Sequence, residues 1–260
     1  MHPTAQIADG ARLGENVTIG AFAVIGPEVV LGDGTSVGSH TLIEGETLIG
    51  KNNRIFSHAV IGSIPQDLKY RGERVRLEIG DENIIREFTL INPGTEGGGA
   101  LTRIGSGNLL MGYVHIAHDV KIGDHCILAN AATLAGHVEL GDYVVIGGMT
   151  PIHQFVRIGD YAMIAGASAL SQDVPPFCLA EGNRAVLRGL NLTGLRRRLD
   201  RPTIDALKSA YRALFERGAP LRETAKELLE STDNEAVASL CHFILASKRG
   251  IPYQRNTHAQ

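Results

Sequence analysis

The sequence is poor in aromatic residues and cysteine, and both shortages limit what the protein can be. Aromatic side chains make up 5% of the 260 residues and tryptophan is absent, which is typical of a fold with few large interior pockets. The three cysteines, Cys126, Cys178 and Cys241, are far apart. They provide neither a metal-binding spacing nor a disulfide framework, so we expect a reducing compartment.

Long apolar runs and targeting signals are also missing. No apolar run reaches the roughly 18 residues that a transmembrane helix needs. The first ten residues have no basic region followed by an apolar one, so they do not resemble a secretory signal. We therefore expect a soluble, cytoplasmic protein with no transmembrane segment.

The strongest pattern is a six-residue period. Each step begins with an aliphatic residue, followed in most steps by a glycine or another small residue. The central run consists of Ile104, Leu110, Ile116, Ile122, Leu128, Leu134, Leu140, Ile146, Ile152, Ile158, Ile164 and Leu170. This period fits neither a helix nor a plain alternating strand and is the signature of a parallel β-helix. Three steps make one triangular coil, and successive coils stack about 4.8 Å apart.

The same period opens the chain, from Ile7 to Ile61, and is interrupted twice before the central run. The interruptions cover residues 63–78 and 92–103 and are polar or glycine-rich. Loops that interrupt a strict repeat are candidate functional segments. We predict a mainly β protein whose β-helix domain covers residues 1–176.

A change of period indicates a second, helical domain over residues 177–260. Residues 177–201 are expected to link the two parts. Spacings of three and four residues then predict helices from about 204 to Gly218, over 221–231 and over about 234–248. These helices are too short to be stable alone, so we expect them to pack together and against the solenoid or another subunit.

Stacking of the coils makes the histidines interpretable. The steps that begin at Ile116, Leu134 and Ile152 form the same face of successive coils, which puts His118, His137 and His153 on one wall. A histidine can act as a general base near neutral pH. Asp119 could orient His118, although neighbours on a strand point to opposite sides and the pairing needs a corner. The plainer interpretation is that these are ordinary surface histidines.

Charge is distributed unevenly along the chain. The net charge is −3, yet residues 184–217 hold nine Arg or Lys against three Asp or Glu. Arg196, Arg197 and Arg198 are consecutive. This segment is either a solvated charge run or a site for phosphates or an acidic partner. Nucleic acid is not expected, because no aromatic platform accompanies the charge.

Several motifs closely resemble the UDP-N-acetylglucosamine 3-O-acyltransferase family, which opens lipid A biosynthesis. They are QDLKY (66–70), LLMGYVHIAHD (109–119), ILANAATLAGHVEL (127–140), GGMTPIHQF (147–155) and QDVPPF (172–177). The resemblance covers almost the whole chain. It implies a left-handed parallel β-helix and a homotrimer with active sites between subunits.

The resemblance also implies the chemistry. An (R)-3-hydroxyacyl group would move from acyl carrier protein, where phosphopantetheine carries it, to the sugar 3-position, with no further cofactor and no metal. His118 would be the general base, Asp119 its partner and the Gly136 N–H the oxyanion donor. The implied substrate-binding residues are Asp67, Lys69, His115, His137, His153, Gln154, Asn191, Arg197 and Arg198. Gly166 would set the acyl-chain length, and the basic segment would suit acyl carrier protein.

Some alternatives stay open at this point. Departures from the family pattern at Asn92-Pro93, Arg184 and Thr193 leave open whether the acceptor carries a 3-hydroxyl or a 3-amino group. A zinc γ-type carbonic anhydrase would need three converging histidine nitrogens. An acetyl-CoA-dependent hexapeptide acetyltransferase would lack the LLMGYVHIAHD context, and a non-catalytic scaffold would leave the His–Asp pair unexplained.

Overall fold

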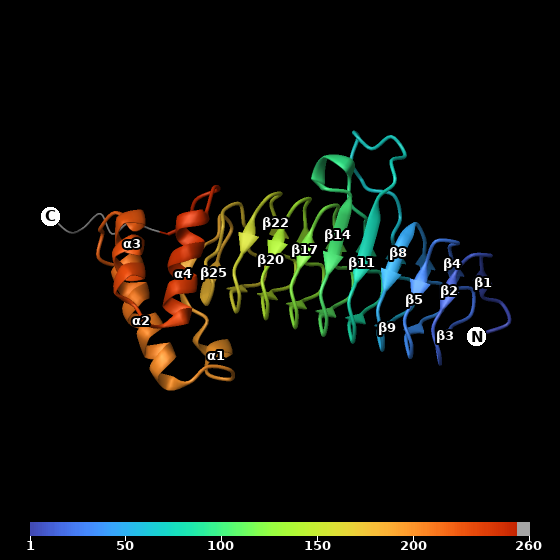
Figure 1. The fold of residues 1–260 in the computed structure, drawn as a ribbon, viewed down its shortest axis with the longest axis horizontal. Coiled ribbons are helices and arrows are strands. Elements are labelled where there is room, and N and C mark those ends of the chain that lie inside the picture. The colour runs from blue at the N-terminus through green and yellow to red at the C-terminus, as the bar shows by residue number, and fades with distance from the viewer. Residues whose placement is uncertain (254–260) are drawn as a thin grey trace.

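The computed structural model describes residues 1–253, which form a long solenoid followed by a group of helices (Figure 1). The solenoid has three faces, each a sheet of short strands, here named sheets A, B and C. Every strand pair within sheets A and B is parallel. The predicted left-handed parallel β-helix is confirmed. Residues 254–260 of the predicted helical domain lie outside the described residues.

Most strands are two residues long. Sheet A contains β1 (Gln6–Ile7), β4 (Val24–Ile25), β7 (Leu42–Ile43), β10 (Val60–Ile61), β13 (Leu90–Ile91), β16 (His115–Ile116), β19 (Thr133–Leu134) and β22 (Pro151–Ile152). Sheet B contains β2 (Arg12–Leu13), β5 (Val30–Leu31), β8 (Glu46–Ile49), β11 (Arg76–Ile79), β14 (Leu101–Ile104), β17 (Lys121–Ile122), β20 (Glu139–Leu140) and β23 (Arg157–Ile158). Sheet C contains β3 (Thr18–Ile19), β6 (Ser36–Val37), β9 (Arg54–Ile55), β12 (Ile84–Ile85), β15 (Leu109–Leu110), β18 (Ile127–Leu128), β21 (Val145–Ile146), β24 (Met163–Ile164), β25 (Cys178–Glu181) and β26 (Val186–Leu190).

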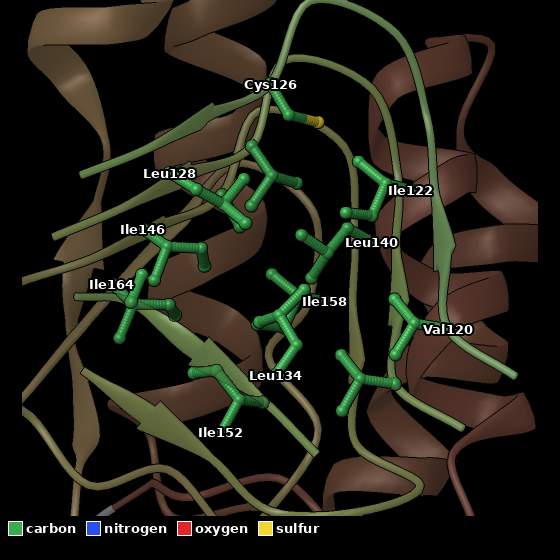
Figure 2. Packing of buried hydrophobic residues seen from close by; sticks show 14 of the residues in the cluster. Val120, Ile122, Cys126, Leu128, Leu134, Leu140, Ile146, Ile152, Ile158 and Ile164 are labelled. Carbon is green, nitrogen blue, oxygen red and sulfur yellow. The ribbon is translucent and has the colours of Figure 1, made fainter. Parts of the chain in front are cut away.

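The first residue of each six-residue step points into the solenoid. Ile116 lies opposite Leu134, and Leu134 opposite Ile152, so residues 18 apart stack directly. All three side chains are buried. Figure 2 shows such inward columns, which include Leu128, Ile146 and Ile164 from sheet C and Ile122, Leu140 and Ile158 from sheet B. Each buried aliphatic side chain stabilises the fold by about 1.5–3 kcal/mol, so the core is a sum of repeated small contributions.

The fourth residue of many steps turns a corner in the left-handed conformation. Asp119, His137 and Phe155 form one such column, with φ of 60°, 62° and 63°. Aromatic rings in these places stack outside the core. One stack, here called the corner ladder, joins Phe22, His40, His58, Phe88 and Tyr113 with ring centroids 4.9–5.1 Å apart. Aromatic residues are therefore few in the interior of the solenoid, as its narrow core requires.

The two interruptions of the repeat replace the same corner in neighbouring coils. Residues 62–75 connect β10 of sheet A to β11 of sheet B, and residues 92–100 connect β13 to β14. The second loop contains a short 3-10 helix, η1 (Glu96–Gly98). The next coil makes this turn with residues 117–120, between β16 and β17. Both loops project from one side of the solenoid (Figure 1), next to the corner that carries His118 and Asp119.

The segment after residue 176 differs from the expected link. β25 pairs in parallel with β24, and β26 folds back antiparallel on β25, so sheet C continues through a hairpin. The expectation of a plain link over residues 177–201 was therefore wrong. The hairpin carries no six-residue period, and its turn passes through Gly182 at φ 112°, a conformation that favours glycine.

Four helices complete the described chain. They are α1 (Leu192–Leu195), α2 (Arg201–Phe215), α3 (Leu221–Ser231) and α4 (Glu235–Ala246). The three predicted helices are confirmed, and α1 was not predicted. Ser247 Oγ donates to Asp173 Oδ2 at 2.7 Å, which ties the end of α4 to the last coil. Within residues 1–253, no helix combines the length and the apolar composition that crossing a bilayer requires.

The stacked core predicts a contrast between two neighbouring residues of β18. Leu128 is fully buried, whereas Ile127 is 38% exposed. Leu128→Ala should lower the free energy of unfolding by about 2–5 kcal/mol, because the close-packed coil cannot collapse onto the cavity. Ile127→Ala should change it by only about 0.5 kcal/mol. Denaturant unfolding of both variants measures this, and equal losses would contradict the inward register.

Candidate active site

The candidate site is built on the corner that follows β16. His118 and Asp119 lie between Ile116 in sheet A and Ile122 in sheet B. The left-handed conformation of Asp119 turns its side chain back toward His118, which two neighbours on a straight strand could not achieve. His118 Nδ1 and Asp119 Oδ2 are 2.7 Å apart. The predicted pairing through a corner is therefore present in the structure.

Burial and hydrogen bonding fix this pair. The side chain of Asp119 is 1% exposed and that of His118 is 15% exposed. Asp119 Oδ1 accepts from Thr95 N at 2.8 Å, and Oδ2 accepts from Thr95 Oγ1 at 2.6 Å. A carboxylate at Nδ1 favours the tautomer that leaves Nε2 unprotonated. Nε2 of His118 is thus the atom that can accept a proton from a substrate.

His137 lies beside the pair, one coil further along. Its ring meets that of His118 edge-on, with centroids 5.1 Å apart, and stacks on Phe155 at 4.3 Å. Its Nδ1 is 3.9 Å from Asp119 Oδ2. Burial lowers the pKa of His137, and the Asp119 carboxylate opposes this shift. A pKa below the usual value keeps this ring neutral at physiological pH, as a hydrogen-bonding partner for a polar substrate.

Gly136 makes room for the His118 ring. A side chain at this position would overlap it, because a Cβ would lie 2.5 Å from His118 Cε1 and 2.7 Å from Nε2. The Gly136 N–H has no hydrogen-bond partner among the described residues. The position therefore combines close approach to the His118 ring with an available backbone donor, as an oxyanion contact would require.

A cleft of about 340 Å³ opens beside His137. It is lined by Asp67, Lys69, Tyr70, Glu73, Thr95, Glu96, Gly97, His137 and Phe155. The two loops that interrupt the repeat thus form its walls, and they bring Asp67 and Lys69 into one cleft with His137. Sequence reasoning missed Thr95, Tyr70 and Phe155. Phe155 carried a signal, because it lies 18 residues after His137, and so did Tyr70, the last residue of QDLKY, whereas Thr95 follows no spacing.

His153 lies apart from the pair. The three histidines belong to stacked steps as expected, but His153 occupies the second place of its step and His118 the third. His153 is exposed, and its Nδ1 is 3.3 Å from Arg249 Nη2. The three histidine nitrogens that the zinc interpretation needs are not brought together in this chain. Ligand-capable atoms of His118, Asp119 and His137 do lie within 4.8 Å of one another, but a hydrogen bond joins the first two residues.

His115 and Gln154 flank the site. His115 lies on sheet A, and its Nδ1 is buried with no partner among the described residues. Burial lowers its pKa. Gln154 is exposed and occupies the same column as His118 and Gly136, two coils further on from His118. Neither residue is among those that line the cleft.

Three of the expected substrate-binding residues, Asn191, Arg197 and Arg198, lie elsewhere on the single chain. Asn191 is buried, accepts from Gly194 N and donates to Tyr161 O at 2.9 Å, so it holds α1 against sheet C. Arg198 lies over the Tyr143 ring at 4.0 Å, and Arg197 is exposed. None of the three lines the cleft.

Gly166 lies in sheet C's corner after β24. A Cβ there would meet Gly148 O at 3.4 Å and Gly148 N at 3.6 Å, which are ordinary contact distances. Its φ is not in the left-handed region. The backbone therefore does not require glycine at this position, in contrast to the crowded Gly136.

Comparison with known proteins agrees with this geometry. A family described as UDP N-acetylglucosamine O-acyltransferase, domain 2, matches residues 173–252, and bacterial transferase hexapeptide repeats match residues 10–45 and 101–136. An acyl-acyl-carrier-protein–UDP-N-acetylglucosamine O-acyltransferase of a Sulfurovum species is 68% identical, covering 99% of both chains. One from Aliarcobacter butzleri is 66% identical, covering 98% of both.

A solved structure extends the likeness to three dimensions. UDP-N-acetylglucosamine acyltransferase from Campylobacter jejuni superimposes with a TM-score of 0.95 at 52% identity, and the match covers 98% of this chain and 99% of that one. The likeness includes the solenoid, both loops and the helices. The chain belongs to the UDP-N-acetylglucosamine O-acyltransferase family.

Proposed function

We propose that the protein transfers an (R)-3-hydroxyacyl chain from acyl carrier protein to the 3-position of the glucosamine ring of UDP-N-acetylglucosamine, the first step of lipid A biosynthesis. The observation that carries the proposal is the His118–Asp119 hydrogen bond beside the cleft, in a chain of this family. The donor travels on the phosphopantetheine of its carrier, so the reaction needs no other cofactor. Both substrates suit a cytoplasmic enzyme.

The proposed reaction is a direct acyl transfer. His118 Nε2 removes the proton of the acceptor hydroxyl while the hydroxyl oxygen attacks the thioester carbonyl carbon. Asp119 stabilises the imidazolium that forms. The oxyanion of the tetrahedral intermediate accepts from the Gly136 N–H. When the intermediate collapses, the carbon–sulfur bond breaks, and His118 returns the proton to the departing thiolate.

His118→Ala tests the base. The variant should lose about 10²–10⁴-fold in kcat, the usual contribution of a general base, and its melting temperature should stay close to that of the parent. His242→Ala is the matched control, because His242 is an exposed histidine on α4. Product formation is followed by mass spectrometry. Near-native turnover by His118→Ala would remove this residue from the mechanism.

We further propose a homotrimer in which each site draws residues from two subunits. Asn191, Arg197 and Arg198 lie outside the single-chain cleft, so a nucleotide in the cleft could meet them only on a neighbouring chain. The corner ladder is a second indication. Phe22, Phe88 and Tyr113 are 56%, 47% and 62% exposed in the single chain, and exposed aromatic side chains are enriched at protein–protein interfaces. The exposed arginines also suit acidic acyl carrier protein.

Mixed assemblies test the shared site. Arg197→Ala/Arg198→Ala should weaken substrate binding without loss of folding, and the loss should be smaller at high salt, because exposed charge contacts are screened. When the double arginine variant is co-expressed with His118→Ala, some sites of a mixed trimer should combine His118 from one chain with Arg197 and Arg198 from the other. The activity of the mixed trimers should therefore exceed that of either variant alone. Sedimentation should show about three chains. No recovery in mixed assemblies, or a fully active monomer, would contradict the shared site.

Gly166 is proposed to keep the acyl slot open. Gly166→Met should lower kcat/KM for long donors and spare shorter ones, because added volume closes a packed slot. Each excluded methylene is worth about 0.8 kcal/mol, so two carbons change the preference about tenfold. A donor panel beside a melting curve measures this. Equal loss for all donors together with a lower melting temperature would indicate that the glycine serves only the backbone.

A further inference from the structure

The carboxylate of Asp119 is held by a residue from outside the repeat. Thr95 belongs to the loop 92–100, and it is the residue that donates to both carboxylate oxygens, at 2.8 Å from its N–H and at 2.6 Å from its hydroxyl. The Thr95 hydroxyl and His118 Nδ1 are both hydrogen-bonded to Asp119 Oδ2. A hydrogen bond to a buried charged group is among the stronger ones in proteins. The direction of the carboxylate therefore depends on the loop.

Thr95 is itself fixed by its own loop. Its carbonyl oxygen accepts from Gly98 N at 3.0 Å and from Ala100 N at 2.7 Å, which closes the turn around η1. Gly98 packs directly on the carboxylate, because a Cβ there would overlap Asp119 Cγ and both carboxylate oxygens. The loop thus presents two donors and a flat surface to Asp119, with no side chain between them.

Other contacts restrain Asp119 less completely. Asp119 N donates to Thr102 Oγ1 at 2.8 Å, which fixes the backbone but not the carboxylate. His137 Nδ1 is 3.9 Å from Oδ2, so a rotated carboxylate could bond to this ring in place of His118. Without the Thr95 hydroxyl, the Thr95 N–H would still hold Oδ1, but Oδ2 would lose the donor that fixes it beside His118 Nδ1.

We propose that Thr95 is a positioning residue that keeps Asp119 directed at His118. The inference rests on the proposed role of His118 as the base. It also assigns a task to the second interruption of the repeat: Thr95, Glu96 and Gly97 line the substrate cleft. The same nine-residue loop, 92–100, therefore forms a wall of the cleft and aligns the catalytic pair.

Thr95→Val is the direct test, since it keeps the shape of the side chain and the backbone N–H that donates to Oδ1 but removes the hydroxyl that donates to Oδ2. The expected result is a fall in kcat of about 10- to 100-fold, the range for one lost hydrogen bond to a charged group, with KM for UDP-N-acetylglucosamine nearly unchanged. Thr95→Ser keeps the hydroxyl and should restore most of the activity. Thr41→Val is the matched control, because Thr41 is also buried and its hydroxyl donates to Phe56 O, on coils remote from the site.

A double-mutant cycle with Asp119→Asn separates positioning from general stability. If Thr95 acts through Asp119, adding Thr95→Val to Asp119→Asn should cost little more, because the two losses concern one interaction. If the fall in kcat of the double variant equals the product of the falls of the two single variants, the inference is overturned. A Thr95→Val enzyme as active as Thr41→Val would also overturn it. Gly98→Ala, which displaces the same carboxylate, should follow the same pattern and gives a second reading if Thr95→Val does not fold.

The outcome is distinguishable from failure of the proposed function. A fully active His118→Ala would refute the base itself. An inactive His118→Ala beside a fully active Thr95→Val would refute only the role of Thr95.

Discussion

The structure depends on one constraint, the stacking of residues 18 positions apart. It places an aliphatic side chain in the core at every sixth position and leaves each corner in register with the next. The same register supports a column of aspartates: Asp124 Oδ1 accepts from Ser106 N at 2.6 Å, and Asp142 Oδ1 accepts from Asp124 N at 2.8 Å. The coils are therefore held by repeated local contacts, and no single contact dominates.

The corner that carries His118 and Asp119 has this rigidity, and the two coils before it depart from the regular corner. His118, Asp119 and His137 occupy ordinary corner places, where the coils fix their backbones. The departures are the loops 62–75 and 92–100, which replace the same corner in the two preceding coils. A solenoid with unbroken corners would have a flat edge here, whereas both loops line a cleft and the loop 92–100 supplies the Thr95 N–H and hydroxyl that hold Asp119.

Periodicity explains how much of this could be predicted. The inward residues, the three longer helices and the His118–Asp119 corner follow from regular spacings. The hairpin β25–β26 does not, because it has no period. His153 was grouped with His118 because both lie on the same face of the solenoid, but the two occupy different places within their steps, and His153 lies near Arg249. Thr95 reaches Asp119 across 24 residues through an irregular loop, so no spacing rule could find it. The left-handed sense of the solenoid and the acyl-transfer chemistry were predicted from the family resemblance and not from the periodicity.

One departure of this chain from its family pattern, Asn92, has a structural role between the two loops. Asn92 is buried, and its amide group donates to Ser63 O and Ile64 O, so it ties the two cleft loops together.

The most direct test of the account is mass spectrometry of the product formed from UDP-N-acetylglucosamine and a 3-hydroxyacyl carrier protein. The account predicts a single acyl group on the sugar 3-oxygen. An unmodified sugar, or acylation at another position, would contradict it.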